Sequence, residues 1–551
     1  MYRRVLAFIA LTLSSCASAR TAPAYDTVIR GGTIYDGGGG APYKGDVAIT
    51  GGRIAAVAPR IPGRGRAEVD ARGLAVAPGF INMLSWAAEP LIRDGKAQSD
   101  VRQGVTLEVM GEGWSMGPFS PAQKAEALAE QTVTRYPISW TTLGGFLSFL
   151  EKKGVSVNVA SMVGASTVRV HELGRNDVDP TPEQLGRMRA LVRRAMDEGA
   201  MGLGSSLIYV PAVYAETEEL VALASEAGRC GGMYISHMRS ESSGLLEAID
   251  ELVEIGRRSG ARAEIYHLKA AGRSNWPLMD SALARIEAAR AAGVAVSADM
   301  YLYSASGTGL DSTLPLWVRE GGPQALHARL KDPAVRARVV ADMAGGTRDW
   351  STVQLVGFTN PALRPYAGKR MPEIAALRGK SPAETAVELV AEDGSQVGTI
   401  FHSISEDNLR KVLARPWVSF GSDAAAMATE PPFTDREVHP RAYGNFARLL
   451  GRYVRDEKAL SLAEAVRRLT SLPADNLRIA DRGRLKSGFH ADLALFDPAK
   501  IDDRATYERP HQYAVGMRHV FVNGVAVLKD GEHTGAKPGR FVRGPGWGKC
   551  K

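Results

Sequence analysis

Two histidines at the polar ends of short apolar runs are the residues best suited to chemistry in this sequence. His237 follows the run at residues 234–236, and His267 follows the run at residues 263–266. A third run, at residues 418–422, leads to Asp423. Two imidazoles and a carboxylate at separate strand ends suit a divalent metal that activates water. A single strand-end histidine could simply be hydrogen-bonded, but the pair together with the aspartate favours a site.

The segment between the two histidines indicates how they are positioned. Leu245, Ile249 and Leu252 recur at helical spacing between the two apolar runs. Strand, helix and strand in this order form a βαβ unit, which places both histidines at equivalent ends of neighbouring parallel strands. A parallel α/β barrel has its active site at this end of its strands.

The rest of the chain extends the same alternation. Candidate barrel strands lie at residues 105–110, 155–163, 201–207, 233–237, 263–268, 294–301, 399–402 and 417–423. We predict an α/β fold: a metal-dependent (β/α)8 TIM-like barrel over residues 78–484, with an inserted subdomain at about residues 310–395. Alternating runs with glycine turns at residues 24–77 and 485–545 predict a small β-sandwich built from both termini.

Composition excludes some classes of function. The net charge of +8 over 551 residues is spread along the chain, with no basic block interleaved with aromatic residues, so we expect no nucleic-acid partner. Once an N-terminal leader is removed, Cys230 and Cys550 are the remaining cysteines. Because one ends a helical segment and the other lies in the C-terminal tail, we expect no disulfide framework.

The first twenty residues predict export. Arg3 and Arg4 form a basic start, and the apolar run at residues 5–13 is too short to span a bilayer. Residues 13–16 end on Cys16 and resemble the lipobox of bacterial lipoproteins, in which the cysteine is acylated; simple cleavage after Ala19 is the alternative. We expect a periplasmic protein or a membrane-anchored lipoprotein, with membrane contact only through a lipid at Cys16.

An ordered series of motifs gives a resemblance that covers nearly the whole mature chain. The chain resembles the amidohydrolase superfamily, specifically the N-acyl-D-amino-acid deacylases (D-aminoacylases), which implies a metal-bearing β/α barrel and a β-sandwich. The motifs that carry it are Pro-Gly-Phe-Ile at 78–81, Tyr-Ile-Ser-His-Met-Arg at 234–239, His-Leu-Lys at 267–269, Gly-Ser-Asp at 421–423 and His-Pro-Arg-Ala-Tyr-Gly at 439–444.

One departure from this resemblance concerns the metal. The superfamily usually has His-x-His after the first barrel strand, but here Leu84 and Trp86 occupy those positions, and neither side chain binds a metal. Glu112 lies one residue out of register with the ligand cysteine of the deacylases, and a carboxylate is a competent ligand. We expect one Zn²⁺ held by Glu112, His237 and His267, the mixed nitrogen and oxygen donors favouring zinc. Glu112 could instead cap a turn.

The resemblance also implies roles for residues around the metal. Asp423 would act as general base and then general acid, although it could also be a ligand or a helix cap. Lys269 and Arg441 would bind the substrate carboxylate, and Tyr209 and Tyr301 would contact the substrate. The remaining side chains near this set have structural interpretations: His439 behind the site, and Arg239 with Glu241 as an ion pair supporting His237.

The function expected from this set is hydrolysis of an N-acyl amino acid, with the D isomer favoured, by attack of a metal-activated water. The loss of the His-x-His pair leaves open a different linear or cyclic amide as the substrate. It also leaves open a catalytically inactive binding protein with the same fold. The joint presence of His237, His267, Asp423, Lys269 and Arg441 favours an enzyme.

Overall fold

Parallel strands close into a barrel. The computed structural model describes residues 23–131, 135–346 and 348–550. β8 and β9 are two parts of one strand, and Met83 N donates to Phe420 O at 3.2 Å where β6 meets β17. The predicted barrel fold is therefore confirmed. Its strands are β6 (Phe80–Asn82), β7 (Val105–Met110), β8 (Asn158–Ser161), β9 (Val163–Gly164), β10 (Gly202–Ser206), β11 (Met233–His237), β12 (Arg262–Ile265), β13 (Val296–Met300) and β17 (Val418–Phe420).

Helices surround these strands and bury their apolar faces against them. α6 begins with a capping box: the Thr181 side chain accepts from Gln184 N, and the Gln184 side chain accepts from Thr181 N, with Pro182 in the first turn. The helices of this layer are α1 (Ala88–Arg93), α2 (Gln98–Val101), α3 (Pro121–Ala129), α4 (Leu143–Lys153), α5 (Ala165–Leu173), α6 (Pro182–Asp197), α7 (Thr217–Arg229), α8 (Leu245–Ser259), α9 (Leu278–Ala291), α15 (Glu406–Leu413), α16 (Arg441–Arg448), α17 (Leu462–Leu469) and α18 (Ser471–Asn476).

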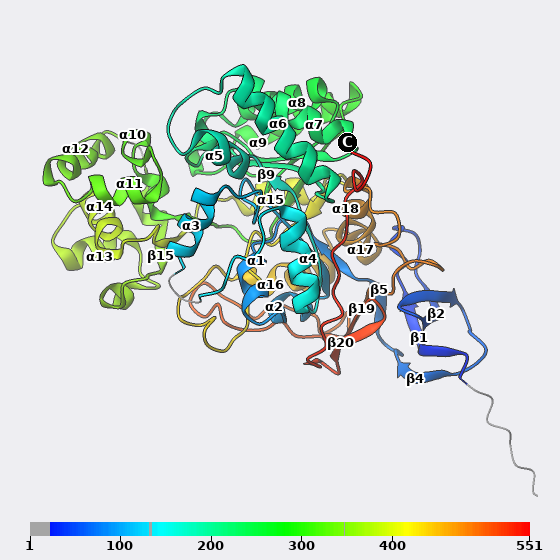
Figure 1. The fold of residues 1–551 in the computed structure, drawn as a ribbon. Coiled ribbons are helices and arrows are strands. Elements are labelled where there is room, and N and C mark those ends of the chain that lie inside the picture. The colour runs from blue at the N-terminus through cyan, green and yellow to red at the C-terminus, as the bar shows by residue number, and fades with distance from the viewer. Residues whose placement is uncertain (1–22, 132–134, 347, 551) are drawn as a thin grey trace, which may run out of the picture.

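A separate group of elements lies to one side of the barrel helices (Figure 1). It has its own apolar core, which includes Leu310, Val339, Leu355 and Leu389. One sequence prediction is wrong here: residues 399–402 lie mostly in β16, an antiparallel strand of this group and not a barrel strand. A short apolar run does not reveal which sheet it joins. The elements are β14 (Ser306–Gly309), β15 (Val353–Gly357), β16 (Gly398–Phe401), α10 (Leu316–Arg319), α11 (Pro323–Arg329), α12 (Pro333–Ala344), α13 (Met371–Arg378) and α14 (Pro382–Asp393).

Strands from both ends of the chain form one nine-stranded sheet. β5 pairs with β1 in parallel and with β18 antiparallel, so the N-terminal and C-terminal strands are joined by hydrogen bonds. The segments before and after the barrel in the sequence therefore form a single β-sheet domain. Its strands are β1 (Tyr25–Ile34), β2 (Tyr43–Thr50), β3 (Arg53–Ala58), β4 (Gly65–Asp70), β5 (Ala75–Pro78), β18 (Leu493–Phe496), β19 (Met517–Val522), β20 (Val525–Lys529) and β21 (Glu532–His533).

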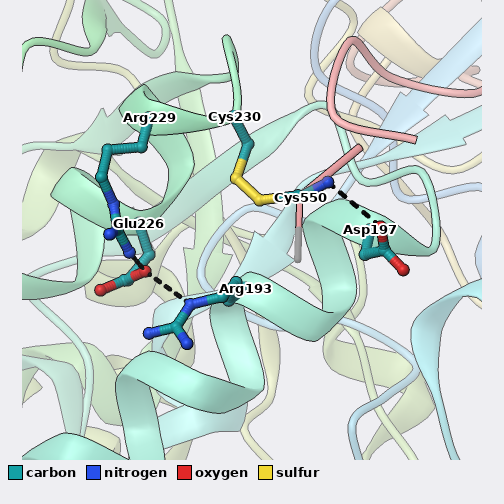
Figure 2. Close-up of a disulfide and its surroundings, with 6 residues drawn as sticks. All are labelled: Arg193, Asp197, Glu226, Arg229, Cys230 and Cys550. Atoms are coloured by element: carbon teal, nitrogen blue, oxygen red, sulfur yellow. Dashed lines mark hydrogen bonds and ion pairs between the residues drawn. A yellow bond between two sulfur atoms is a disulfide. The ribbon is translucent and has the colours of Figure 1, made fainter. Parts of the chain in front are cut away.

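The C-terminal tail is attached to the barrel by a disulfide, which corrects the expectation drawn from the cysteines. Cys230, directly after α7, is bonded to Cys550 (Figure 2). Beside it, Cys550 N donates to Asp197 Oδ1 at 3.1 Å. The two cysteines are 320 residues apart in sequence. Sequence spacing gives no sign of a pairing that depends on the tail running back along the barrel.

The predicted export signal and Cys16 lie outside the described residues. Within the described part of the chain, no helix is long and apolar enough to cross a membrane.

Candidate metal centre and active site

Three buried side chains converge on one point at the carboxyl ends of the barrel strands. Glu112 Oε1 lies 3.0 Å from His237 Nδ1 and 3.1 Å from His267 Nε2. His237 is the last residue of β11, His267 follows β12, and Glu112 follows β7. Glu112 is 4% exposed, His237 is 5% exposed and His267 is 2% exposed. The sequence expectation that both histidines meet at one site is thus matched by the geometry.

This group fits a metal ion by its donor chemistry. One donor atom from each of Glu112, His237 and His267 lies within 4.8 Å of the others. Donors at zinc-ligand distances around a tetrahedral ion are about 3.4 Å apart, close to the separations from Glu112 Oε1 to the two imidazole nitrogens. Burial would raise the pKa of Glu112, but hydrogen bonds from His237 and His267 hold that pKa below its usual value. The carboxylate is therefore ionised, as a ligand must be.

A second carboxylate, Glu241, contacts His267 on the opposite side of the ring from Glu112. Glu241 Oε1 lies 2.8 Å from His267 Nδ1 and 2.5 Å from Lys269 Nζ. Burial and the Lys269 charge lower the pKa of His267, but Glu241 and Glu112 raise that pKa to about 10. Lys269 Nζ also lies 2.9 Å from His267 Nδ1, so Nδ1 faces the Glu241–Lys269 pair. Nε2 is then the nitrogen that faces Glu112 and could ligate a metal that displaces its proton.

Lys269 is enclosed by the same contacts. Its Nζ donates to Glu241 and to the His267 carbonyl at 3.1 Å, and it lies 5.6 Å from the centre of the Tyr301 ring. The residue is 6% exposed. In the structure the amine pairs with Glu241. Binding of the substrate carboxylate by Lys269 stays a prediction.

Asp423 is held through both of its oxygens. Trp86 Nε1 donates to Asp423 Oδ1 at 3.1 Å, and Arg441 Nη1 lies 2.8 Å from Asp423 Oδ2. Burial raises the pKa of the Asp423 carboxyl; the Arg441 charge opposes this, and the Glu112 charge adds to it. Asp423 also has a positive φ of 49°, which its short side chain tolerates. The carboxylate is thus fixed in direction at the end of β17.

The remaining predicted substrate residues lie around this centre. The Tyr209 ring is 5.3 Å from the His237 ring, and Tyr209 OH hydrogen-bonds Thr308 Oγ1 of β14 at 2.8 Å. The Tyr301 ring is 6.2 Å from the His267 ring, and the Arg441 guanidinium carbon is 4.5 Å from the centre of the Tyr301 ring. The group of elements beside the barrel therefore contributes one wall of the site through β14.

Two predictions concern residues next to this group, the Arg239–Glu241 pair and His439. The predicted Arg239–Glu241 pair is wrong: Arg239 pairs with Glu251 at 2.8 Å, since the chain turns after His237 and directs Glu241 toward His267. His439 does lie behind the site, accepting from Arg441 N and donating to Ala305 O. Sequence reasoning missed Glu241 as a partner of His267, although its place four residues after His237 was a usable signal.

Comparisons with known proteins give matches along most of the chain. Residues 67–528 match the model of the amidohydrolase family. An N-acyl-D-glutamate deacylase of Alcaligenes xylosoxydans xylosoxydans is 32% identical over 94% of this chain and 96% of its own. The N-acyl-D-glutamate deacylase of Bordetella bronchiseptica, solved with zinc and a phosphonate mimic of the tetrahedral intermediate, superposes with a TM-score of 0.78 at 29% identity, over 94% of this chain and 99% of that one.

A solved D-aminoacylase is similar to the same degree. It has a TM-score of 0.78 at 30% identity, over 94% of this chain and all of its own, and its binuclear metal centre is described as showing one-metal activation and second-metal attenuation. The chain belongs to the amidohydrolase family. Within that family it is a member of the N-acyl-D-amino-acid deacylase (D-aminoacylase) group, a hydrolase of carbon–nitrogen bonds other than peptide bonds.

Proposed function

We propose that the protein removes the N-acyl group from N-acyl-D-amino acids, using one zinc ion held by Glu112, His237 and His267. The observation that carries the proposal is the convergence of these three donors at the barrel mouth that also holds Asp423. A zinc ion at this position would supply Lewis-acid chemistry, polarising the scissile carbonyl and lowering the pKa of a water molecule.

The chain's own residues account for the proton transfers. Asp423 accepts a proton from the water that attacks the acyl carbon. As the carbon–nitrogen bond breaks, Asp423 returns that proton to the leaving nitrogen. The products are the carboxylic acid and the free amino acid. Because Trp86 and Arg441 fix the Asp423 carboxylate, it does not have to reorient between the two transfers.

In this proposal, Arg441 and Tyr301 receive the substrate carboxylate. Arg441 is 5% exposed; Nη1 forms an ion pair with Asp423 Oδ2 at 2.8 Å, and Nη2 donates to Gly307 O at 3.4 Å. Neither Nε nor Nη1 has a hydrogen-bond partner among the described residues. A guanidinium with a free donor binds a carboxylate well. Tyr209 hydrogen-bonds Thr308, which follows Gly307 in β14.

Two residues after the first barrel strand support the proposed count of one ion. Leu84 is 1% exposed and packs in the barrel core, and Trp86 donates to Asp423, so neither offers a metal donor. The related D-aminoacylase is activated by one metal and attenuated by a second. A protein without the second position would hold one zinc ion and would escape attenuation by excess zinc.

The experiment combines metal analysis with a substrate panel. Purified protein should contain close to one zinc per chain, and N-acetyl-D-amino acids should release amine faster than their L isomers. A protein without transition metal would contradict the proposed centre. Preferential hydrolysis of the L isomers, or of cyclic amides only, would replace the proposed substrate.

We also propose that the protein is exported. The N-terminal residues 1–20 have the pattern of a lipoprotein signal, and the Cys230–Cys550 disulfide suits an oxidising compartment. Cell fractionation should place the full-length protein in the envelope, and Cys16→Ala should abolish labelling by radioactive palmitate. Recovery of the full-length protein from the cytosol would contradict export.

A further inference from the structure

Trp86, after the first barrel strand, combines a hydrogen bond to Asp423 with a solvent-exposed ring. Its indole N–H is hydrogen-bonded to Asp423, yet the residue is 42% exposed, one of the large apolar residues most open to solvent. Its backbone is fixed, because Trp86 N donates to Ala424 O at 3.0 Å and Ser85 pairs with Ala424. An exposed aromatic ring held firmly beside a catalytic carboxylate is placed to contact what binds there.

The two oxygens of Asp423 define two sides of the site. Oδ2 faces Arg441, and Oδ1 faces Trp86. In an N-acyl amino acid, the carboxylate and the acyl chain lie on opposite sides of the scissile carbon–nitrogen bond. If the carboxylate lies at Arg441 and the bond lies at Asp423, the acyl chain extends toward Trp86.

We propose that Trp86 determines acyl-group selectivity: the indole N–H positions Asp423 while the exposed ring contacts the acyl chain, so that apolar acyl groups longer than acetyl are preferred. This inference rests on the proposed deacylase function. Covering the ring with an acyl chain removes apolar surface of both partners from water, a gain that acetyl is too short to provide. Selectivity from a partly open apolar contact is on the order of tenfold.

The test compares N-acetyl, N-hexanoyl and N-phenylacetyl derivatives of one D-amino acid. The wild type should show kcat/KM about tenfold higher for the two larger groups. Trp86→Phe keeps a ring but loses the N–H, so it should keep the preference while kcat falls about tenfold on all three substrates, as expected for the loss of a hydrogen bond to a charged group. Trp86→Ala should lose the preference as well, through a higher KM for the larger groups.

Trp547, on the C-terminal tail, is the matched control because it is 55% exposed and its ring contacts Arg543. Trp547→Ala should leave both kcat and the acyl preference unchanged. Zinc content should be equal in all variants. A measurement on the wild type alone covers the case in which a Trp86 variant fails to fold: hexanoate should inhibit about tenfold more strongly than acetate.

The outcomes separate this inference from the function on which it rests. Hydrolysis of the whole panel with equal kcat/KM, or an unchanged preference in Trp86→Ala, would overturn the acyl contact while leaving the deacylase function intact. Full kcat in Trp86→Phe would overturn the positioning role. If none of the N-acyl-D-amino acids is hydrolysed, the proposed function falls and this inference falls with it.

Discussion

Lys269 Nζ lies 2.5 Å from Glu241 Oε1, and the same carboxylate oxygen lies 2.8 Å from His267 Nδ1. The lysine therefore neutralises the carboxylate that contacts His267, one of the proposed zinc ligands. Burial would raise the pKa of Glu241, but the Lys269 charge and the two histidines hold that pKa well below its usual value. Family resemblance assigns Lys269 to the substrate carboxylate, but in the structure Lys269 pairs with Glu241.

Replacement of Glu241 should weaken zinc binding. Glu241→Gln removes the negative charge 2.8 Å from His267 Nδ1, and loss of such an outer partner typically costs 10–100-fold in metal affinity. Competition with a chromogenic chelator measures the affinity directly. Glu251→Gln is the matched control, because Glu251 pairs with Arg239 and touches neither histidine in the described contacts. Equal zinc affinity in the two variants would contradict the orienting role.

Lys269→Met separates the two roles of the lysine. If Lys269 acts through Glu241, zinc affinity should fall in this variant. If it binds the substrate carboxylate, KM should rise at least tenfold with zinc affinity unchanged, since a hydrogen bond between charged groups is worth about 1.5–3 kcal/mol. Chelator competition and steady-state kinetics on the same preparation distinguish the two results.

Metal binding and proton transfer should be separable by substitution. His237→Ala removes a ligand nitrogen, so zinc and activity should be lost together. Asp423→Asn keeps the three donors but cannot accept a proton, so zinc should remain at one per chain while kcat falls by a factor on the order of 10²–10⁴. Zinc by elemental analysis and kcat by amine release provide the two readouts. Normal turnover in Asp423→Asn would exclude the proton-transfer role.

Glu264, inside the barrel, should make stability depend on pH. Burial raises its pKa to about 7, while Ser297 and Asn476 donate to the carboxyl group. A carboxyl whose folded-state pKa lies above its unfolded value stabilises at low pH, and that stability is lost as pH rises from about 4.5 to about 7. The resulting change in stability is on the order of a few kcal/mol.

Glu264→Gln removes that titration. The slope of unfolding free energy against pH between 4.5 and 7 should therefore be shallower in the variant, measured by urea denaturation at several pH values. The comparison uses the slope, because the amide also changes the hydrogen bonds with Ser297 and Asn476 at every pH. Parallel curves for the two proteins would show that Glu264 does not titrate as its burial predicts.

The tail disulfide should contribute to stability but not to zinc binding. Cys550→Ser opens a closure that spans 320 residues of sequence, and loss of a native disulfide typically costs about 2–4 kcal/mol. The variant should melt at a lower temperature than the wild type and should no longer respond to a non-thiol reductant. A wild-type melting temperature that is insensitive to reductant would contradict a stabilising bond.

Much of the architecture follows from sequence because it is local or periodic. The capping box at Thr181 and Gln184 depends on residues three positions apart, and the alternation of strand and helix predicts parallel strands. The assignment of residues 399–402 to the barrel failed because strand propensity does not specify a partner strand, and antiparallel pairing to β14 and β15 is a long-range choice.

The sequence by itself determined which residue types could do the chemistry: histidines at two strand ends, Asp423 at a third, and no metal donor at Leu84 or Trp86. Parallel strands bring their carboxyl ends to one edge, so the meeting of His237 and His267 could be inferred before any coordinates. Only the tertiary structure decided what each side chain touches. Glu241 turns to His267 and not to Arg239, Trp86 donates to Asp423, and Cys550 reaches Cys230. The physical reason is that such contacts depend on loop paths and side-chain directions, which sequence spacing does not encode beyond a single element.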